Sequence, residues 1–440
     1  MIVMKFGGSS VANREQIEKV LTIVRDRLDQ HPVVVCSAHK GVTDALIDAA
    51  RLAASGRDPG EAVIERQRAV ADSLGCDPDL LAPCFSEIRD LLRGIRLVGE
   101  LSPRSLDYIS SFGERMSVRC IADFFSRQGM PTRAFDAWDL GLRTDDNFGR
   151  ARPLPGYAEA MQAAFAERVP PGVVALVTGF VAKGKDGVIT TLGRNGSDLT
   201  ATLVGAALGA REVQIWSDTD GVMSADPSIV PAAKSIAAMR FDEAAELAYF
   251  GSRVLHPATL VPAIDKDIPV RVLNTNRPDH PGTLIESAPT PKPDPVTSIA
   301  YKEGQGVLTI MEPRMFEQVG FLARFFEILA RREVVVDLVA TSEVSVSITS
   351  HDCAALHAVV DELRPLGQVE VKEGKTILAV VGRHIQHSKG IGARVLSAIS
   401  AADVNVEMHT FGMSSNNMSL VIDDSAIARA VASLHAALFE

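Results

Sequence analysis

MIVMKFGGSS, residues 1–10, joins a short apolar run to a lysine and a pair of glycines. The first four residues predict a buried strand, and residues 11–28 place apolar side chains at helical spacing, so a helix should follow the turn. Gly7 and Gly8 have no Cβ, which lets the backbone approach a ligand closely and adopt positive φ. A strand, a glycine turn and a helix N-terminus form a general anion-binding arrangement, to which Lys5 adds a full charge. The stretch predicts a phosphate site, although a tight turn with a surface lysine would suit the same residues.

The bulk composition is that of a globular protein whose 440 residues suffice for two or three domains. A net charge of −10 without a long basic run argues against nucleic acid or a membrane surface as the main partner. No apolar run approaches the roughly 18 residues that span a bilayer, and the chain enters its first strand without a signal peptide. The five cysteines are scattered, and His384 and His387 form the only close histidine pair, so we expect no metal site and a cytoplasmic protein with reduced thiols.

Residues 1–285 alternate β-branched apolar runs with helical stretches rich in alanine and leucine. This alternation predicts an α/β domain with a largely parallel central sheet. Ligands of such sheets bind beyond the carboxyl ends of the strands, where the glycine turn lies. Residues 286–296 hold four prolines in eleven positions and predict a stiff linker, so we expect a domain boundary there.

The remaining residues, 297–440, repeat themselves at an offset of 70 positions. GFLARFFEILARREVVVD (320–337) aligns with GIGARVLSAISAADVNVE (390–407). Each copy predicts a helix and a strand with a further strand on either side, which gives two βαββ modules at about 306–350 and 376–423. Such a pair would suit sensors of small molecules that act on the first domain. A duplicated dimerisation or scaffolding domain is the other interpretation.

A second glycine-rich loop lies in TTLGRNGSDLTATLVGAALGA (190–210). Arg194, between two glycines, suits bidentate recognition of a carboxylate or a phosphate. Ser197 can cap the helix that starts at Asp198. The carboxylate of Asp198 can order a nearby lysine or a metal–phosphate group, or can serve only the start of the helix.

Two further stretches carry charged residues, and the local sequence does not decide between a structural and a functional role for them. SFGERMS (111–117) sets Glu114 beside Arg115, which by itself is typical of a solvated helix face. WSDTDGVMSADPSIV (216–230) follows a predicted strand and holds three acids, a glycine and a proline. It could bind the ribose and base of a nucleotide or be only a polar turn.

Together these stretches resemble the aspartokinases of the amino acid kinase family. The matching stretches, in order, are VMKFGGSSVA, CSAHKGVTDAL, SFGERMS, VTGFVA, TTLGRNGSDLTATLV, IWSDTDGVMSADP, FDEAAELAYFGSRVLHPATLVPA and GFLARFFEILARREVVVDLVATSEVSVSIT. They cover essentially the whole chain, and TSEVSV and GMSSNNMSLVI are most similar to the monofunctional, lysine-sensitive branch. The resemblance implies an α/β amino acid kinase domain with a mainly parallel sheet, followed by two ferredoxin-like ACT domains.

The reaction implied by the resemblance is transfer of the γ-phosphoryl group of ATP to the β-carboxylate of L-aspartate, the first step of aspartate-family amino acid biosynthesis. A carboxylate nucleophile is ionised at neutral pH, so catalysis requires positioning and charge stabilisation rather than a general base. Lys5 and the glycine turn would hold the phosphoryl group, and Asp198 would organise Lys5 and the Mg²⁺ carried by ATP. The pocket for aspartate would comprise Arg194 at the α-carboxylate, Glu114 at the α-ammonium, and the lining residues Ser37, Thr43, Phe180 and Ser197.

The resemblance also implies residues that bind the nucleotide and an effector. The nucleotide would contact Lys5, Gly7, Gly8, Ser217, Asp218, Val222, Met223, Asp226 and Arg253. A lysine effector would bind between the first ACT domains of two subunits, in a homodimer or higher oligomer. Its pocket would be lined by Met315, Gln318, Gly320, Phe321, Leu322, Val336, Asp337, Thr341, Ser342 and Glu343. The chain departs from the usual residues of the family at Met223, Ser228, Arg253, Gln318, His39 and Lys40.

Two other functions remain as alternatives. Another amino acid kinase, such as a glutamate 5-kinase or an acetylglutamate kinase, would share the fold but not the repeated tail. A regulator that senses amino acids without catalysis would not need Lys5, Glu114, Arg194 and Asp198 together, and all four are present.

Overall fold

The computed structural model describes residues 1–251, 256–289, 295–412 and 416–440, and the chain divides into two compact units. The first unit is Met1–Val222, Ala237–Phe241 and Val254–Pro289, and the second is Met223–Ile236, Asp242–Arg253 and Thr290–Glu440. The predicted linker, 286–296, lies partly outside the described residues, and the predicted domain boundaries stay predictions.

The first unit is built on an eight-stranded sheet, counted over the described residues, with the order β3-β4-β2-β1-β7-β9-β10-β8. Its strands are β1 (Ile2–Phe6), β2 (Pro32–Cys36), β3 (Thr132–Phe135), β4 (Val174–Thr178), β7 (Val213–Ser217), β8 (Ala238–Arg240), β9 (Val270–Asn274) and β10 (Thr283–Glu286). β1 pairs in parallel with β2 and β7, and only the β9–β10 pair of this sheet is antiparallel among the described strands. The mainly parallel sheet predicted from the sequence is confirmed. A short hairpin, β5 (Val181–Lys183) and β6 (Ile189–Thr191), stands apart from it.

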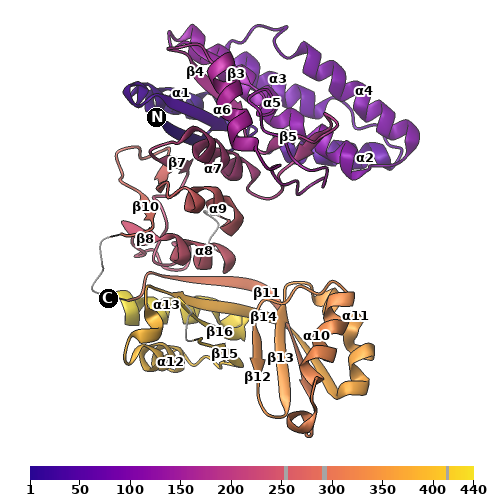
Figure 1. The fold of residues 1–440 in the computed structure, drawn as a ribbon, viewed down its shortest axis with the longest axis vertical. Helices are drawn as coiled ribbons and strands as arrows, with labels where there is room; N and C mark the ends of the chain where they lie inside the picture. The colour runs from indigo at the N-terminus through magenta and orange to yellow at the C-terminus, as the bar shows by residue number, and fades with distance from the viewer. Residues whose placement is uncertain (252–255, 290–294, 413–415) are drawn as a thin grey trace. The chain divides into compact units, whose positions relative to one another are not determined.

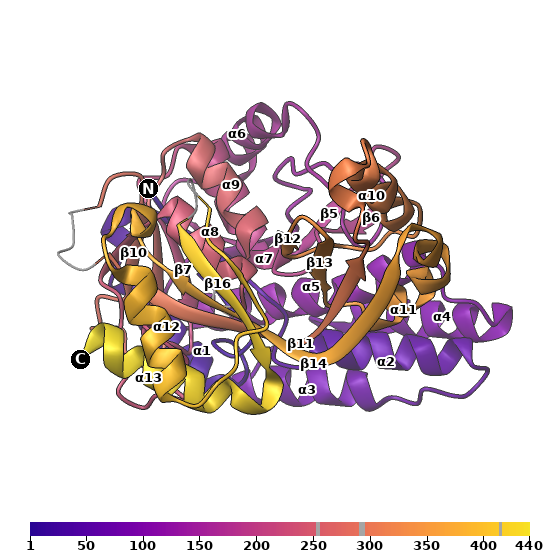
Figure 2. The same ribbon diagram turned by 90° about the horizontal axis from the view of Figure 1, so that it is seen from below.

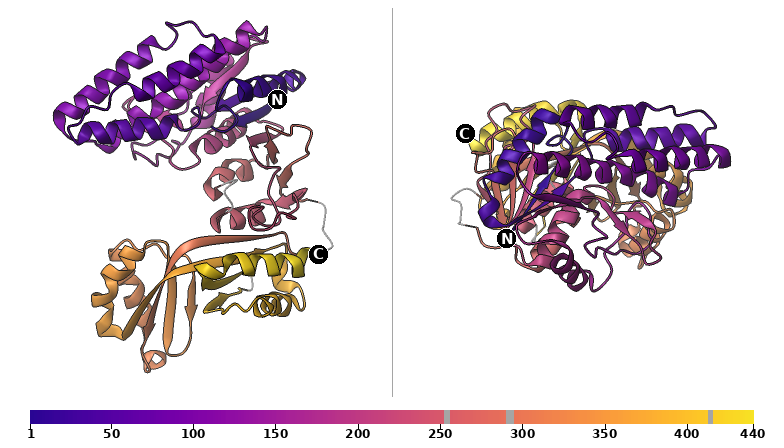
Figure 3. Two further views of the ribbon diagram at one scale, coloured as in Figure 1. Left: turned by 180° about the vertical axis from the view of Figure 1, so that it is seen from behind. Right: turned by 90° about the horizontal axis from the view of Figure 1, so that it is seen from above.

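Helices cover both faces of this sheet (Figure 1). They are α1 (Arg14–Arg25), α2 (Val42–Ala54), α3 (Ala62–Leu74), α4 (Ala82–Val98), α5 (Pro103–Arg127), α6 (Tyr157–Arg168), α7 (Gly196–Leu208) and α9 (Pro257–Asp265). α2, α3, α4 and α5 pack against one another, and their indigo and purple ribbons lie together in Figure 3. α7 contacts α6, α9 and β1 on the other side.

The residues of β1 alternate between the two layers, as the period of a strand requires. Ile2, Met4 and Phe6 are fully buried in the core that includes α1 to α5. Val3 and Lys5 point the other way, toward α7, where Lys5 meets a carboxylate. One strand therefore serves the core with three side chains and the candidate site with a fourth.

The second unit contains a six-stranded sheet in the described residues, with the order β12-β13-β11-β14-β16-β15. Its strands are β11 (Ser298–Met311), β12 (Val339–Thr341), β13 (Ser345–Ser350), β14 (Gln368–Val381), β15 (Met408–Thr410) and β16 (Asn417–Asp423). Its helices are α8 (Phe241–Tyr249, whose first residue belongs to the first unit), α10 (Phe321–Arg331), α11 (Cys353–Leu363), α12 (Ile391–Ala401) and α13 (Ile427–Phe439). The predicted strand at 306–311 is part of β11, and the predicted strand at 376–382 is part of β14 except for its last residue.

The long strands β11 and β14 run side by side through both modules, as Figure 2 shows. Residues 307–311 of β11 pair with 368–372 of β14, while 298–302 pair with 377–381. The first half of β11 therefore supplies the fourth strand of the second module, and the first half of β14 supplies that of the first. Each module is thus completed by chain from the other, and the two share one sheet. No helix of the described residues is long and apolar enough to cross a membrane.

Candidate active site

An ion pair between Lys5 and Asp198 lies at the centre of the candidate site. Lys5 is on β1, near the middle of the sheet, and Asp198 is in the first turn of α7. Lys5 Nζ lies 2.5 Å from Asp198 Oδ1, and the two side chains are only 12% and 6% exposed. The pair brings together two residues that the sequence analysis placed in separate motifs, and it holds the ammonium in one position.

The glycine turn after β1 approaches other parts of the site closely. A Cβ on Gly7 would lie 3.4 Å from Lys5 Nζ, and one on Gly8 would lie 3.1 Å from the carbonyl oxygen of Ala38. Neither glycine has positive φ, so that part of the prediction was wrong. At Gly8 a Cβ would crowd the backbone of the loop after β2, whereas at Gly7 it would only reach contact distance of the Lys5 ammonium. The Gly7 N–H donates to the carbonyl of Trp216 on β7, at 3.3 Å.

Glu114 is buried on α5 and faces the loop after β2. Its carboxylate accepts from the backbone N–H of Ala38, and burial raises its pKa to about 8, an effect that the positive charge of Lys5 opposes. Its Oε2 atom has no hydrogen-bond partner among the described residues. A buried acceptor without a partner is costly, so this oxygen is suited to a cationic ligand.

Ser37 and Thr43, which were predicted to share a pocket with Glu114, contact the residues of α5 on either side of it. A Cβ on Gly113, the neighbour of Glu114, would lie 2.8 Å from the Ala38 Cβ and 3.0 Å from Thr43 Oγ1. The Ser117 hydroxyl donates to the Ser37 carbonyl at 2.9 Å, one helical turn further along α5. α5 is therefore held tightly against Ser37 in the loop after β2 and against Thr43 in the first turn of α2.

Phe180 and Ser197 are also brought together. Phe180 follows β4 with φ of 66°, a conformation that is uncommon for an aromatic residue and costs free energy. The Thr200 hydroxyl on α7 accepts from the Phe180 N–H at 3.0 Å and so supports this conformation. A Cβ on Gly179 would lie 2.5 Å from the buried Ser197 side chain. The sequence analysis did not identify Thr200, which looks like an ordinary residue within a helix.

Arg194 is the one exposed residue among those predicted for the aspartate pocket. Within the described residues no ion pair or hydrogen bond of its guanidinium is found, so the structure does not join it to the other site residues. The next residue, Asn195, is left-handed with φ of 55°, and its amide nitrogen lies 3.4 Å from Asp198 Oδ2. Asparagine tolerates this conformation, so its place between Arg194 and a glycine was a usable signal.

One buried acid and one buried histidine, neither of which the reaction requires, support these loops. Asp107 on α5 accepts from the backbone N–H groups of Gly149 and Thr191 at 2.9 and 2.8 Å, and so ties β6 to the helix. His39 is buried, and its Nδ1 bonds the Val11 carbonyl at 2.6 Å, which makes Nδ1 the donor. Burial lowers the pKa of His39 to about 4, so the ring is neutral at pH 7. His39 thus joins the loops after β1 and β2.

Lys40, the other unusual residue of this loop, has an exposed side chain. Its carbonyl accepts from Arg66 Nη2 at 2.9 Å, which ties the loop to α3. The structure gives its ammonium no place in the site.

The predicted nucleotide residues fall in both units. Ser217 and Asp218 end β7, and Val222 follows them in the first unit. This loop is anchored by Thr283, whose hydroxyl accepts from the Val222 N–H at 2.8 Å, and by Asn274, whose amide nitrogen lies 3.4 Å from the Asp218 carbonyl oxygen. The sequence analysis identified neither anchor.

Met223 and Asp226 belong to the second unit, and Arg253 lies outside the described residues. Asp226 Oδ1 accepts from the Ser228 N–H at 2.8 Å, and Oδ2 accepts from the Tyr301 hydroxyl at 2.8 Å. Asp226 and the unusual Ser228 therefore form a turn that is bonded to β11. The carboxylate is already occupied within its own unit.

The predicted effector residues lie in the first module of the second unit. Gly320 caps α10 with φ of 81°, and Phe321 is buried in the core of the module. The Gln318 side chain, at a position that departs from the family, accepts from Arg324 Nη2 at 3.0 Å and so turns toward α10, which follows it in the chain. The Asp337 carboxylate, in contrast, is fully bonded within the unit. The other predicted residues are Met315, Leu322, Val336, Thr341, Ser342 and Glu343.

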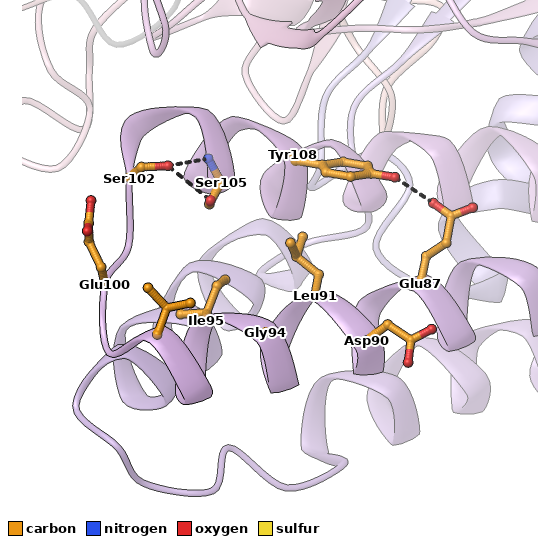
Figure 4. Close-up of a pocket in the computed structure, with 10 residues that line it drawn as sticks. Glu87, Asp90, Leu91, Gly94, Ile95, Glu100, Ser102, Ser105 and Tyr108 are labelled. Atoms are coloured by element: carbon orange, nitrogen blue, oxygen red, sulfur yellow. Dashed lines mark hydrogen bonds between the residues drawn. The ribbon is translucent and has the colours of Figure 1, made fainter.

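A separate cavity of about 450 Å³ lies between α4 and the start of α5, and its lining includes Glu87, Asp90 and Glu100 (Figure 4). The Tyr108 hydroxyl donates to Glu87 Oε2 there at 3.1 Å. None of the predicted site residues lines this cavity. No group of three or more His, Cys, Asp or Glu side chains that could hold a metal ion occurs in the described part of the chain.

Comparisons with known proteins identify the family of the chain. The model of the amino acid kinase family matches residues 1–274, and an ACT-domain model matches 378–438. Aspartokinase 1 of Arabidopsis thaliana is 38% identical, over all of this chain and 80% of the relative. The lysine-sensitive aspartokinase 3 of Escherichia coli is 35% identical, over all of this chain and 99% of the relative.

Solved structures extend the similarity to the three-dimensional fold. Escherichia coli aspartokinase III bound to aspartate and ADP matches with a TM-score of 0.82 and 34% identity, over the whole of both chains. The structure of the same enzyme with lysine and aspartate matches with a TM-score of 0.76 and 35% identity, also over both whole chains. The chain therefore belongs to the amino acid kinase family and, within that family, to the aspartokinases.

Proposed function

We propose that the chain transfers the γ-phosphoryl group of ATP to the β-carboxylate of L-aspartate, giving 4-phospho-L-aspartate and ADP. The observation that carries the proposal is the buried Glu114 carboxylate on α5, which has one unpartnered oxygen and is bonded to Ala38, the residue that the glycine turn beside Lys5 also approaches. An amino-acid ammonium would satisfy that oxygen. The related enzyme from Escherichia coli has been solved with aspartate and ADP, which supports the same two ligands here.

The catalytic step needs charge stabilisation more than proton transfer. The β-carboxylate of aspartate attacks the γ-phosphorus, the bond to the bridging oxygen breaks, and ADP leaves with that electron pair. Lys5 is held by Asp198 and would stabilise the negative charge of the transferring group without reorganisation during the step. The Mg²⁺ carried by ATP would supply further positive charge, and Asp198 is the carboxylate placed to organise it.

Substrate selection would come from two charged groups. Glu114 would pair with the α-ammonium, and Arg194, which is exposed and unpaired among the described residues, would pair with the α-carboxylate. Aspartate would then be fixed at its α-carbon, with its side-chain carboxylate directed to the phosphoryl group. Glutamate has a longer side chain, and acetylglutamate lacks an ammonium.

A coupled assay for ADP release, with aspartate, glutamate and acetylglutamate as acceptors, tests the proposal. We expect turnover with aspartate and at least a hundredfold lower kcat/KM with the other two. Comparable turnover of glutamate or acetylglutamate would assign the chain to another branch of the family. No turnover of any acceptor by folded protein would favour a sensor without catalysis.

We further propose that lysine inhibits the enzyme by binding at the first ACT module, at the interface of a homodimer. The related enzyme that is named lysine-sensitive supports the effector. The dimer is supported by the surface of this module, where β12 is an edge strand and several large apolar side chains are exposed. These side chains are Met311, Val319, Leu322, Val335, Val339 and Val344.

The five cysteines are free thiols, which supports a reducing compartment such as the cytoplasm.

A further inference from the structure

The Asp337 carboxylate, in the predicted effector pocket, is already held by an ammonium from its own chain. Lys302 Nζ on β11 lies 2.9 Å from Asp337 Oδ2, and the Tyr249 hydroxyl donates to Oδ1 at 2.7 Å. The Asp337 side chain is 2% exposed, whereas that of Lys302 is 26% exposed. Both oxygens of a buried acid are therefore satisfied, one of them by a cation that can reach water.

The internal repeat provides a second copy of this arrangement in the same molecule. At the offset of 70 positions, Lys302 corresponds to Lys372 and Asp337 corresponds to Glu407. Lys372 Nζ lies 3.9 Å from Glu407 Oε2, so the ammonium–carboxylate pair occurs in both modules. The pair therefore recurs at corresponding positions of the repeat, each time between a carboxylate of one module and a lysine on the strand that the long β11–β14 pairing brings to it.

The second copy differs from the first in one decisive respect. Lys375 Nζ lies 2.7 Å from Glu407 Oε1 and 2.5 Å from Asp423 Oδ1, and its side chain is only 8% exposed. The corresponding position of the first module is Gln305, which is buried and carries no charge. The carboxylate of the second module therefore has two internal ammonium groups, and that of the first module has one.

The free energy needed for an effector ammonium to displace the internal lysine differs between the two carboxylates. At Glu407 it would have to displace a buried lysine that is bonded to two acids, which would leave charges unpaired. At Asp337 it would exchange with Lys302, whose long side chain can carry its ammonium into solvent. Such an exchange keeps the number of buried ion pairs constant.

We propose that Lys302 is an internal competitor that sets the effector affinity of the first module. Its ammonium occupies Asp337 when no effector is bound, and an ammonium group of the effector takes its place. The second module carries its own permanent occupant, Lys375, and binds no effector at Glu407. This inference rests on the proposed function, because it requires that an amino-acid effector binds at Asp337.

The test compares Lys302→Met with the matched variant Lys372→Met in the full-length chain. Lysine binding is measured by calorimetry, and the midpoint of lysine inhibition is measured in the ADP-release assay. We expect Lys302→Met to tighten lysine binding and lower the midpoint at least tenfold, because the competitor is gone. Lys372→Met should leave both within twofold of the wild type, because Lys375 still holds Glu407.

Lys302→Arg provides a variant that keeps the charge and the fold. Its guanidinium can hold the carboxylate with two hydrogen bonds, so lysine should bind at least threefold more weakly than to the wild type. Folded Lys302→Met with an unchanged or higher midpoint, or Lys302→Arg with unchanged binding, would overturn the competitor while leaving lysine regulation standing. A wild-type chain that neither binds lysine nor is inhibited by it would overturn both proposals.

Discussion

Aspartate binding should expel a proton from Glu114 at neutral pH. Burial raises the pKa of Glu114 to about 8, so most of the free enzyme carries a protonated Glu114 at pH 7. An ammonium group at the unpartnered Oε2 favours the ionised carboxylate, so substrate binding lowers this pKa and the proton leaves. The charge of Lys5 already lowers the pKa of Glu114 in part. Because Lys5 is paired with Asp198, a second cation at Glu114 can lower this pKa further.

The size of this effect follows from the pKa of the free enzyme. With a value of about 8, aspartate should release about nine-tenths of a proton at pH 7 and about half a proton at pH 8. If the pKa of the complex is well below 6, the dissociation constant rises by up to about tenfold for each pH unit that the pH drops below 8. Between pH 6 and pH 8 the binding of aspartate should tighten about 50-fold.

Titration calorimetry at pH 6, 7 and 8, in buffers with different ionisation enthalpies, measures both the affinity and the proton release. Glu114→Gln is the control, because its side-chain amide does not ionise between pH 6 and pH 8. This variant should bind aspartate weakly at every pH and release no proton. An aspartate dissociation constant that stays flat from pH 6 to pH 8, without proton release, would refute the reasoning. Without substrate, the raised pKa predicts that stability falls as the pH rises from about 4.5 through 8.

Four substitutions test the remaining assignments. Lys5→Met should lower kcat by about 10²–10³-fold, because a preorganised charge acts mainly in the transition state, and a rate within threefold of the wild type would contradict this role. Arg194→Ala should raise the KM for aspartate far more than the KM for ATP, and Arg194→Lys should not restore the wild-type KM for aspartate. A change confined to the KM for ATP would place Arg194 at the nucleotide. Thr200→Val removes the acceptor for the Phe180 N–H and should raise the KM for aspartate several-fold, whereas unchanged kinetics would show that this hydrogen bond is dispensable. Glu343→Ala should raise the midpoint of lysine inhibition at least tenfold, and inhibition by threonine instead of lysine would show that the effector was misassigned.

Local patterns along the chain were enough for the fold class. The apolar runs at β2, β4, β7 and β9 and the helical periodicity between them predicted a mainly parallel α/β sheet, which the structure confirms. The offset of 70 residues predicted the two modules of the second unit. Both predictions rest on which side chains are buried, a property that the period of a strand or helix records in neighbouring residues.

The candidate site depends on contacts that no local pattern records. The sequence placed Lys5, Glu114 and Asp198 in different motifs, and the order of the strands brings β1 to the loop after β2 on one side and to α7 on the other. The glycine turn was predicted with positive φ, which neither glycine adopts, and the structure shows instead that Gly8 approaches the backbone of Ala38 closely.

By itself, the sequence determined the class of fold, the repeat and the residue types of a phosphoryl-transfer site. Only the tertiary structure decided that Glu114 is buried with an unpartnered oxygen, that each ACT module borrows a strand from the other, and that Lys302 holds Asp337. The physical reason is that periodicity reports whether a residue faces the core, whereas the free energy of a charge depends on groups that lie far away in the chain. Desolvation and pairing of charges are set by those distant neighbours, and the fold alone brings them within a few ångströms.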